Sequence, residues 1–177
     1  ISNPDILFEI LKNIDSPQNN ENLISSLRES FDNAGDAFQH IPSSTHLSLD
    51  PYMTAAREFK MEHILRIALR DILKKIDLVD VMIELSCLAD IILENSLRII
   101  RNSMDKIYGA PANDAFCVIS LGKLGGDELN FSSDVDLLYV YGTEAGETTG
   151  IATEQGIIKN KISNHEYYCK LGEILTR

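Results

Sequence analysis

The residues of this chain best suited to do chemistry are two aspartates, Asp134 and Asp136. They open an apolar run, residues 135–142 (VDLLYVYG), that has the composition of a β-strand. Side chains at positions i and i+2 of a strand point to the same face, so the two carboxylates converge on one small volume. Two like charges placed this close repel each other unless a cation lies between them. Because hard oxygen ligands favour Mg²⁺ or Mn²⁺ over zinc, the pair predicts a site for one of these two metals.

A glycine-bearing turn precedes the aspartates in the segment LGKLGGDELNFSSDVDLL, residues 121–138. An apolar run ends at Gly122, and glycine in a turn lets backbone N–H groups approach an anion closely. Ser133 adds a hydroxyl donor beside the carboxylates. A carboxylate pair, an anion-binding turn and a hydroxyl together predict metal-assisted phosphoryl or nucleotidyl transfer.

Each part of this pattern is weak evidence by itself. Exposed carboxylates two residues apart are common in strands and loops, and the turn is not a Walker A loop because it lacks the order GxxxxGK[ST]. The functional interpretation therefore depends on the combination of the turn, the aspartates and the two apolar runs that flank them.

Two strands must position these residues, and they follow a long helical region. The runs 115–122 and 135–142 are continuously apolar, which predicts strands buried on both faces or nearly so. Helices are expected before them, at residues 4–14, 23–34, 51–75 and 78–108, since apolar residues recur there with helical spacing.

The longest of these helices has clear end signals. Asp77 is the expected N-cap, and Gly109 and Pro111 end the helix. Loops are predicted at 35–50 and 143–156, and a last helix from about Ser163. The fold class is therefore α+β, with a helical region over residues 1–110 and a second unit, a short sheet with flanking helices, over residues 111–177.

Composition excludes several classes of function. The 177 residues carry a formal charge of −11, which argues against binding to nucleic acid or to an anionic membrane surface. The sequence contains no run of about 18 uncharged apolar residues, so no membrane-spanning helix is predicted. Cys87, Cys117 and Cys169 are odd in number and form no CxxC pair, so we expect buried free thiols and a cytoplasmic location.

The remaining polar residues have ordinary interpretations. The histidines lack paired metal-ligand spacing, and His63 and His165 lie on predicted helices, where a surface or core role is expected. Arg66, Arg70 and Asp71 lie within about one helical turn and predict an ion pair on the helix surface.

The segment GKLGGDELNFSSDVDLLYVY closely resembles the signature of bifunctional glutamine synthetase adenylyltransferase/adenylyl-removing enzymes. These enzymes belong to the DNA polymerase β-like nucleotidyltransferases, whose broader pattern has Gly-Ser or Gly-Gly where this chain has Gly122-Lys123. The resemblance covers about residues 50–177 and includes HILRIALRDI, ELSCLADIIL and the closing HEYYCKLGEIL segment.

The resemblance implies a role for each candidate residue. Asp134 and Asp136 would hold the Mg²⁺ or Mn²⁺ ions, and Gly122, Lys123 and Ser133 would hold nucleotide or phosphate oxygens. The family's third carboxylate comes from a D-x-R-L-R-P strand that this sequence does not contain. The polymerase β-like unit is therefore expected to be incomplete, and we expect this chain alone to be inactive or nearly so.

The resemblance also implies a reaction. The family has two such domains: the N-terminal one removes AMP by phosphorolysis and the C-terminal one attaches AMP from ATP. The segments ELNFSSDVDL and RIALRD look more like the removing half. Phosphate would then attack the AMP linked to a tyrosine of glutamine synthetase, releasing ADP, and a PII-type signal protein is a further partner that the family implies.

Three alternatives stay open. The chain could belong to the adenylylating half, or to a relative that modifies a PII-type protein, although such relatives usually carry a GYGRGEL-like turn. It could also be a catalytically silent nucleotide-binding module, against which the intact Asp134 and Asp136 argue. Because the chain starts at Ile1 and stops within a helical pattern, we expect a piece of a longer protein.

Overall fold

The computed structural model describes residues 4–16, 19–36, 49–112 and 115–176. Four helices come first: α1 (Pro4–Lys12), α2 (Asn20–Asp36), α3 (Asp50–Ile72) and α4 (Leu78–Tyr108). They are followed by β1 (Phe116–Leu121), α5 (Gly122–Gly125), β2 (Asp136–Tyr141), β3 (Ile151–Ala152), β4 (Ile158–Lys159) and α6 (Asn164–Leu175). The predicted α+β class, with helices followed by a short sheet, is confirmed. Most of the loop predicted at 35–50 lies outside the described residues.

Helix α4 is the central element, and its predicted bounds are confirmed. The Asp77 carboxylate accepts a hydrogen bond from the Asp80 N–H at 2.9 Å, and the Asp80 carboxylate accepts one from the Asp77 N–H at 3.4 Å. This reciprocal capping box begins the helix. Gly109 ends it with a φ of +73°, a conformation that glycine adopts without strain.

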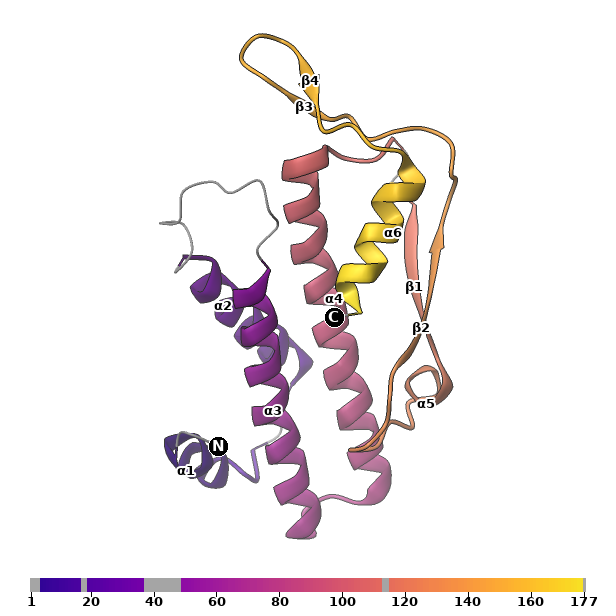
Figure 1. Ribbon diagram of the computed structural model, residues 1–177. Helices are drawn as coiled ribbons and strands as arrows, with labels where there is room; N and C mark the ends of the chain where they lie inside the picture. Colours follow the sequence, from indigo (N-terminus) through magenta and orange to yellow (C-terminus); the bar gives the residue numbers. More distant parts are fainter. Residues whose placement is uncertain (1–3, 17–18, 37–48, 113–114, 177) are drawn as a thin grey trace.

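Two hydrophobic clusters share α4. On one side, α2, α3 and α4 pack together with Leu124 and Leu129, which follow β1 in the chain. On the other side, Ile100 and Met104 of α4 pack against Leu171 and its neighbours on α6. Figure 1 shows α6 lying between α4 and the β1–β2 pair. The strands therefore reach the helical region largely through α6 and the segment around α5.

The sheet that carries the aspartates has two antiparallel strands. Their register runs from Phe116 opposite Tyr141 to Leu121 opposite Asp136. One face carries aromatic rings, with Phe116 and Tyr141 both stacked on Tyr168 of α6 at centroid distances of 5.3 and 5.0 Å.

The other face of this sheet is exposed, so the prediction of strands buried on both faces is wrong for the described chain. Four apolar side chains on it are 42–48% exposed: Ile119, Leu121, Leu138 and Val140. A continuous apolar run indicates strand composition, but the elements packed against each face decide which side chains are buried.

Several local predictions also need correction. Cys117 and Cys169 are exposed and Cys87 is half-buried, although all three are free thiols as expected. Residues 151–152, predicted as loop, form strand β3, which pairs with β4 in a small hairpin that projects from the rest of the chain (Figure 1).

The arginines of α3 do not form the predicted surface pair with Asp71. Arg66 is buried and donates a hydrogen bond to the Ser16 carbonyl, while Arg70 pairs with Glu84 of α4. Burial lowers the pKa of Arg66, and the neighbouring Arg70 lowers it further. These arginines therefore tie α3 to α4 and to the segment after α1. None of the helices in the part of the chain described here has the length and hydrophobicity of a membrane-spanning segment.

Candidate functional site

The predicted glycine turn is a single helical turn, α5, that follows β1 directly. Gly122 has a φ of +57°, which residues other than glycine, asparagine and aspartate adopt only with strain. A Cβ atom on Gly125 would lie 2.5 Å from the Ser120 carbonyl oxygen, so this position also requires glycine. Gly126, in contrast, has no neighbouring atom nearer than 3.8 Å to such a Cβ. The first two of these glycines thus let the chain fold back tightly on β1.

The register of the sheet brings this turn to the second aspartate. Asp136 is the first residue of β2 and pairs with Leu121, the residue before Gly122. A Cβ on Gly122 would lie only 3.3 Å from the Asp136 Oδ2 atom. The structure therefore places the turn and one carboxylate in direct proximity, as the spacing of the motif predicts.

Asp134 lies two residues before the first paired residue of β2, so strand geometry alone does not set its direction. A cavity beside this segment supplies the missing information. Ser133, Val135 and Leu137 line the cavity, whereas the aspartates between them are exposed and do not line it. This alternation continues the period of an extended chain. Asp134 and Asp136 therefore share the face that points away from the cavity.

The other two predicted site residues differ in placement. Lys123 is exposed on α5 and forms no ion pair with any other described residue. Ser133 lies on the cavity side, where its Oγ accepts a hydrogen bond from the Asn130 N–H at 3.1 Å. The structure thus places Asp136 beside Gly122 and turns Ser133 to the opposite side of the segment. The roles predicted for these residues stay predictions.

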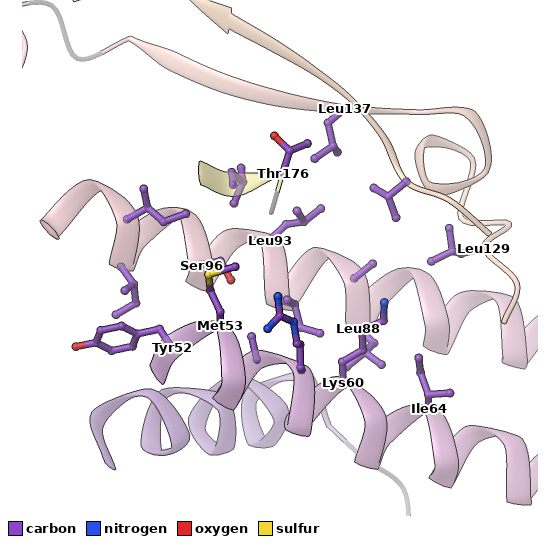
Figure 2. Close-up of a pocket in the computed structure, with 18 of the residues that line it drawn as sticks. Tyr52, Met53, Lys60, Ile64, Leu88, Leu93, Ser96, Leu129, Leu137 and Thr176 are labelled. Carbon is purple, nitrogen blue, oxygen red and sulfur yellow. The ribbon is translucent and has the colours of Figure 1, made fainter. Parts of the chain in front are cut away.

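The cavity behind the aspartates has a volume of about 450 Å³, and the sequence did not indicate it. Helices α3 and α4, the segment before β2 and the end of α6 form its walls, and Figure 2 shows Leu129 and Leu137 facing Leu88 and Leu93 across it. Its lining is mainly apolar, with Lys60 among the polar exceptions. Of the apolar stripe predicted on α3, Ile64 lines the cavity, and the fold shows that this part of the helix is left partly uncovered.

Two carboxylates are a donor set that Mg²⁺ uses in proteins. No group of three or more His, Cys, Asp or Glu side chains within the described ranges is arranged to hold a metal, so Asp134 and Asp136 supply at most two ligands. Mg²⁺ is usually bound through one or two carboxylates together with substrate phosphates and water. The donor set is therefore suited to an ion that is completed by a phosphate-bearing substrate.

Comparison with known families supports a relationship along the whole chain. Residues 1–177 match the family model described as glutamate-ammonia ligase adenylyltransferase. The chain belongs to this family. This agrees with the resemblance carried by the turn and the aspartates.

The names of individual relatives include both an adenylyltransferase and an adenylyl-removing activity. The chain is 31% identical over 175 residues to a bifunctional glutamine synthetase adenylyltransferase/adenylyl-removing enzyme of Nitrosomonas eutropha, covering 94% of this chain and 17% of that protein. It is 37% identical over 125 residues to the protein of the same name in Haemophilus ducreyi, covering 67% of this chain and 12% of that protein. The chain therefore spans less than a fifth of the length of these relatives.

Proposed function

We propose that this chain contributes the metal-binding and nucleotide-binding turn of an adenylyl-removing nucleotidyltransferase. In this reaction, inorganic phosphate displaces a glutamine synthetase tyrosine from its bond to AMP, and ADP is released. Membership of the glutamate-ammonia ligase adenylyltransferase family supports the substrate. Similarity of ELNFSSDVDL and RIALRD to the removing half supports the direction.

One observation carries the proposal: Asp134 and Asp136 lie exposed on the same face of an extended segment, and Asp136 lies directly beside Gly122. The open face leaves room for a large protein substrate that carries its nucleotide on a side chain. The cavity on the opposite face is lined by apolar groups, which suits packing more than phosphate binding.

The residues of the chain have separable tasks in the proposed reaction. Asp134 and Asp136 would bind Mg²⁺ or Mn²⁺, which would neutralise charge on the transferred phosphoryl group. Gly122 lets the main chain pass close to Asp136, so backbone N–H groups of the turn can approach phosphate oxygens. Lys123 is an exposed cation in the same turn and would attract the anionic substrate.

The test follows ADP formation by the full-length protein from adenylylated glutamine synthetase, phosphate and Mg²⁺. Asp134→Asn and Asp136→Asn should each reduce this rate by at least about 100-fold, because each removes a metal ligand without changing the backbone. Asp127→Asn is the matched control. It removes an exposed carboxylate from the same turn at a φ of +56°, which asparagine tolerates, and should leave the rate unchanged.

The same variants separate the alternatives. Loss of AMP attachment from ATP, with removal intact, would assign the chain to the adenylylating half. Unchanged rates of both reactions would show that the carboxylates are not catalytic and would favour a silent nucleotide-binding module. Cytoplasmic location and a PII-type partner belong to the same proposal, and neither is needed for this test.

A further inference from the structure

A second group of reactive side chains lies at the other end of β2. Cys169 and His165 are one turn apart on α6, a spacing that places them on the same face of the helix. The Cys169 Sγ atom lies 3.6 Å from Nε2 and 3.9 Å from Nδ1 of His165. The thiol is therefore within hydrogen-bonding reach of an imidazole nitrogen.

The imidazole is held from its other side by β2 and the residues after it. The Tyr141 hydroxyl lies 2.7 Å from Nδ1 of His165 and donates to Glu144 Oε1 at 3.4 Å. In the tautomer that carries its hydrogen on Nδ1, His165 donates to the Tyr141 hydroxyl oxygen while that hydroxyl donates to Glu144. Nε2 then has no hydrogen and can accept the proton of the Cys169 thiol. The four side chains form a relay in the order Cys169, His165, Tyr141, Glu144.

The relay packs against a buried side chain on one side and is exposed to solvent on the other. Tyr141 stacks on Tyr168, whose side chain is 2% exposed, so packing fixes the ring that orients His165. Cys169 itself is exposed, and the His165 side chain is 57% exposed. A small reagent can thus reach the sulfur without any change in the fold.

The charged groups around the pair come from both elements. From the β2 side, Glu144 lies 3.9 Å from Nδ1 of His165. On α6 itself, Glu166 is paired with Lys170 at 3.4 Å, and Glu173 follows Cys169 by one turn. The imidazole is therefore the nearest base to the thiol, since the carboxylates are paired, directed at Nδ1 or a full turn away.

We propose that Cys169 is a thiol-modification site, activated by His165, that reacts with small disulfides of the glutathione class. The thiol proton moves to Nε2 of His165, and Sγ attacks one sulfur of the disulfide. A new S–S bond forms, the original S–S bond breaks, and the second sulfur leaves with the electron pair as a thiolate that takes up a proton. Cys169 is oxidised to a mixed disulfide and the reagent is reduced by the same two electrons.

This site is separate from the one proposed for adenylyl removal. Asp136 and Tyr141 are the first and last residues of β2, so the two sites are about 17 Å apart at about 3.4 Å per residue. The thiol reaction therefore does not depend on the proposed function, and its test can succeed or fail independently.

The chain contains its own control for this proposal. Cys117 is also exposed, on β1, but its thiol donates a hydrogen bond to the Val118 carbonyl oxygen at 3.7 Å and lies against no imidazole of the described residues. Cys87 is half-buried beside Asn20, with an Sγ–Oδ1 distance of 3.1 Å. Three thiols in one molecule thus differ in exposure and in the presence of a neighbouring base.

The experiment incubates the 177-residue chain with oxidised glutathione near neutral pH and follows each cysteine by peptide mass spectrometry. Cys169 should form its mixed disulfide about tenfold faster than Cys117, because His165 Nε2, at 3.6 Å, can accept the thiol proton as Sγ attacks. His165→Gln should lower the Cys169 rate to that of Cys117 and leave the Cys117 rate unchanged. Equal rates for the two cysteines, or no effect of His165→Gln on Cys169, would overturn the proposal.

A measurement on the unmodified sequence guards against misfolding of the variant. In the folded chain Cys169 should react about tenfold faster than Cys117, and the two rates should become equal in urea, because unfolding separates His165 from Cys169. A difference between the two rates that persists in the unfolded chain would exclude the contact with His165 as its cause.

Discussion

The proximity of Gly122 to Asp136 is the residue-level feature that the sequence predicts best. The motif places a glycine at the end of one strand and an aspartate at the start of the next, and the antiparallel register makes these two ends neighbours. The direction of Ser133 could not be predicted in the same way. It depends on the turn at Asn130, whose N–H donates to the Ser133 hydroxyl, and no spacing rule indicates that contact.

The three glycines of the turn should respond differently to alanine. Gly125→Ala should destabilise the chain by about 1–3 kcal/mol, because its Cβ would meet the Ser120 carbonyl oxygen. Gly122→Ala should cost about 1–2 kcal/mol, because of its positive φ. Gly126→Ala is the control and should change the free energy of unfolding by less than about 0.5 kcal/mol. Urea denaturation measures all three, and an equal response would show that the turn relaxes freely.

His63 should make the stability of the chain depend on pH. It is 7% exposed, its ring lies tilted against Phe59 at a centroid distance of 4.2 Å, and its Nδ1 has no partner among the described residues. Burial, followed by the neighbouring Arg66, lowers the pKa of His63 from 6.5 to about 4. The unfolded chain thus binds this proton more readily than the folded one. The stabilising contribution is complete above about pH 6.5 and is lost as the pH falls towards 4, by up to about 3 kcal/mol.

The matched variants for this prediction are His63→Leu and His165→Gln. The first removes the buried titrating ring and should flatten the fall in unfolding free energy between pH 6.5 and 4 relative to the unmodified chain. The second removes an exposed imidazole and should leave that fall in place. If His63→Leu shows the same slope as the unmodified chain, carboxylates cause the acid sensitivity.

At the level of elements, both ends of α4 were predicted, whereas the start of α2 and the burial of the strands were not. Asp77 and Gly109 mark the ends of α4 in the sequence itself. Helix α2 begins at Asn20, three residues before the predicted start, because Asn19 supplies a cap that accepts from the Glu21 N–H at 2.8 Å. The exposed face of β1 and β2 could not be predicted, since it depends on which elements pack against the sheet.

The cap of α4 gives an element-level test. Asp77→Ala removes the acceptor for the Asp80 N–H and should lower the free energy of unfolding by about 1 kcal/mol. Asp77→Asn keeps an acceptor oxygen in the same place and should cost only a few tenths of that amount. Urea midpoints measure both. If Asp77→Asn lowers the free energy of unfolding as much as Asp77→Ala does, the effect comes from the charge near the helix N-terminus and not from the hydrogen bond.

For the molecule as a whole, α4 packs against elements on both sides of the domain boundary that the sequence predicts near Pro111. The change of period near Pro111 predicts two domains, yet buried residues of α4 contribute to both hydrophobic clusters. A hydrogen bond from the Tyr167 hydroxyl to the Asp105 carboxylate, at 2.5 Å, further ties α6 to α4. Burial and this bond to Asp105 both raise the pKa of Tyr167. Periodicity identifies each element but carries no information about which face another element will cover.

Because α4 is common to both clusters, we expect the chain to unfold in one transition. Leu85→Ala removes a side chain from the cluster with α2 and α3, and Met104→Ala removes one from the cluster with α6. Each should lower the same transition by about 2–5 kcal/mol, whether helix content or tyrosine environment is followed. Met61→Ala, at a side chain 62% exposed, is the control and should change little. If, in Met104→Ala, the tyrosine signal instead changes in a separate transition from the loss of helix content, residues 111–177 unfold as a separate domain. The domain boundary near Pro111 would then be confirmed.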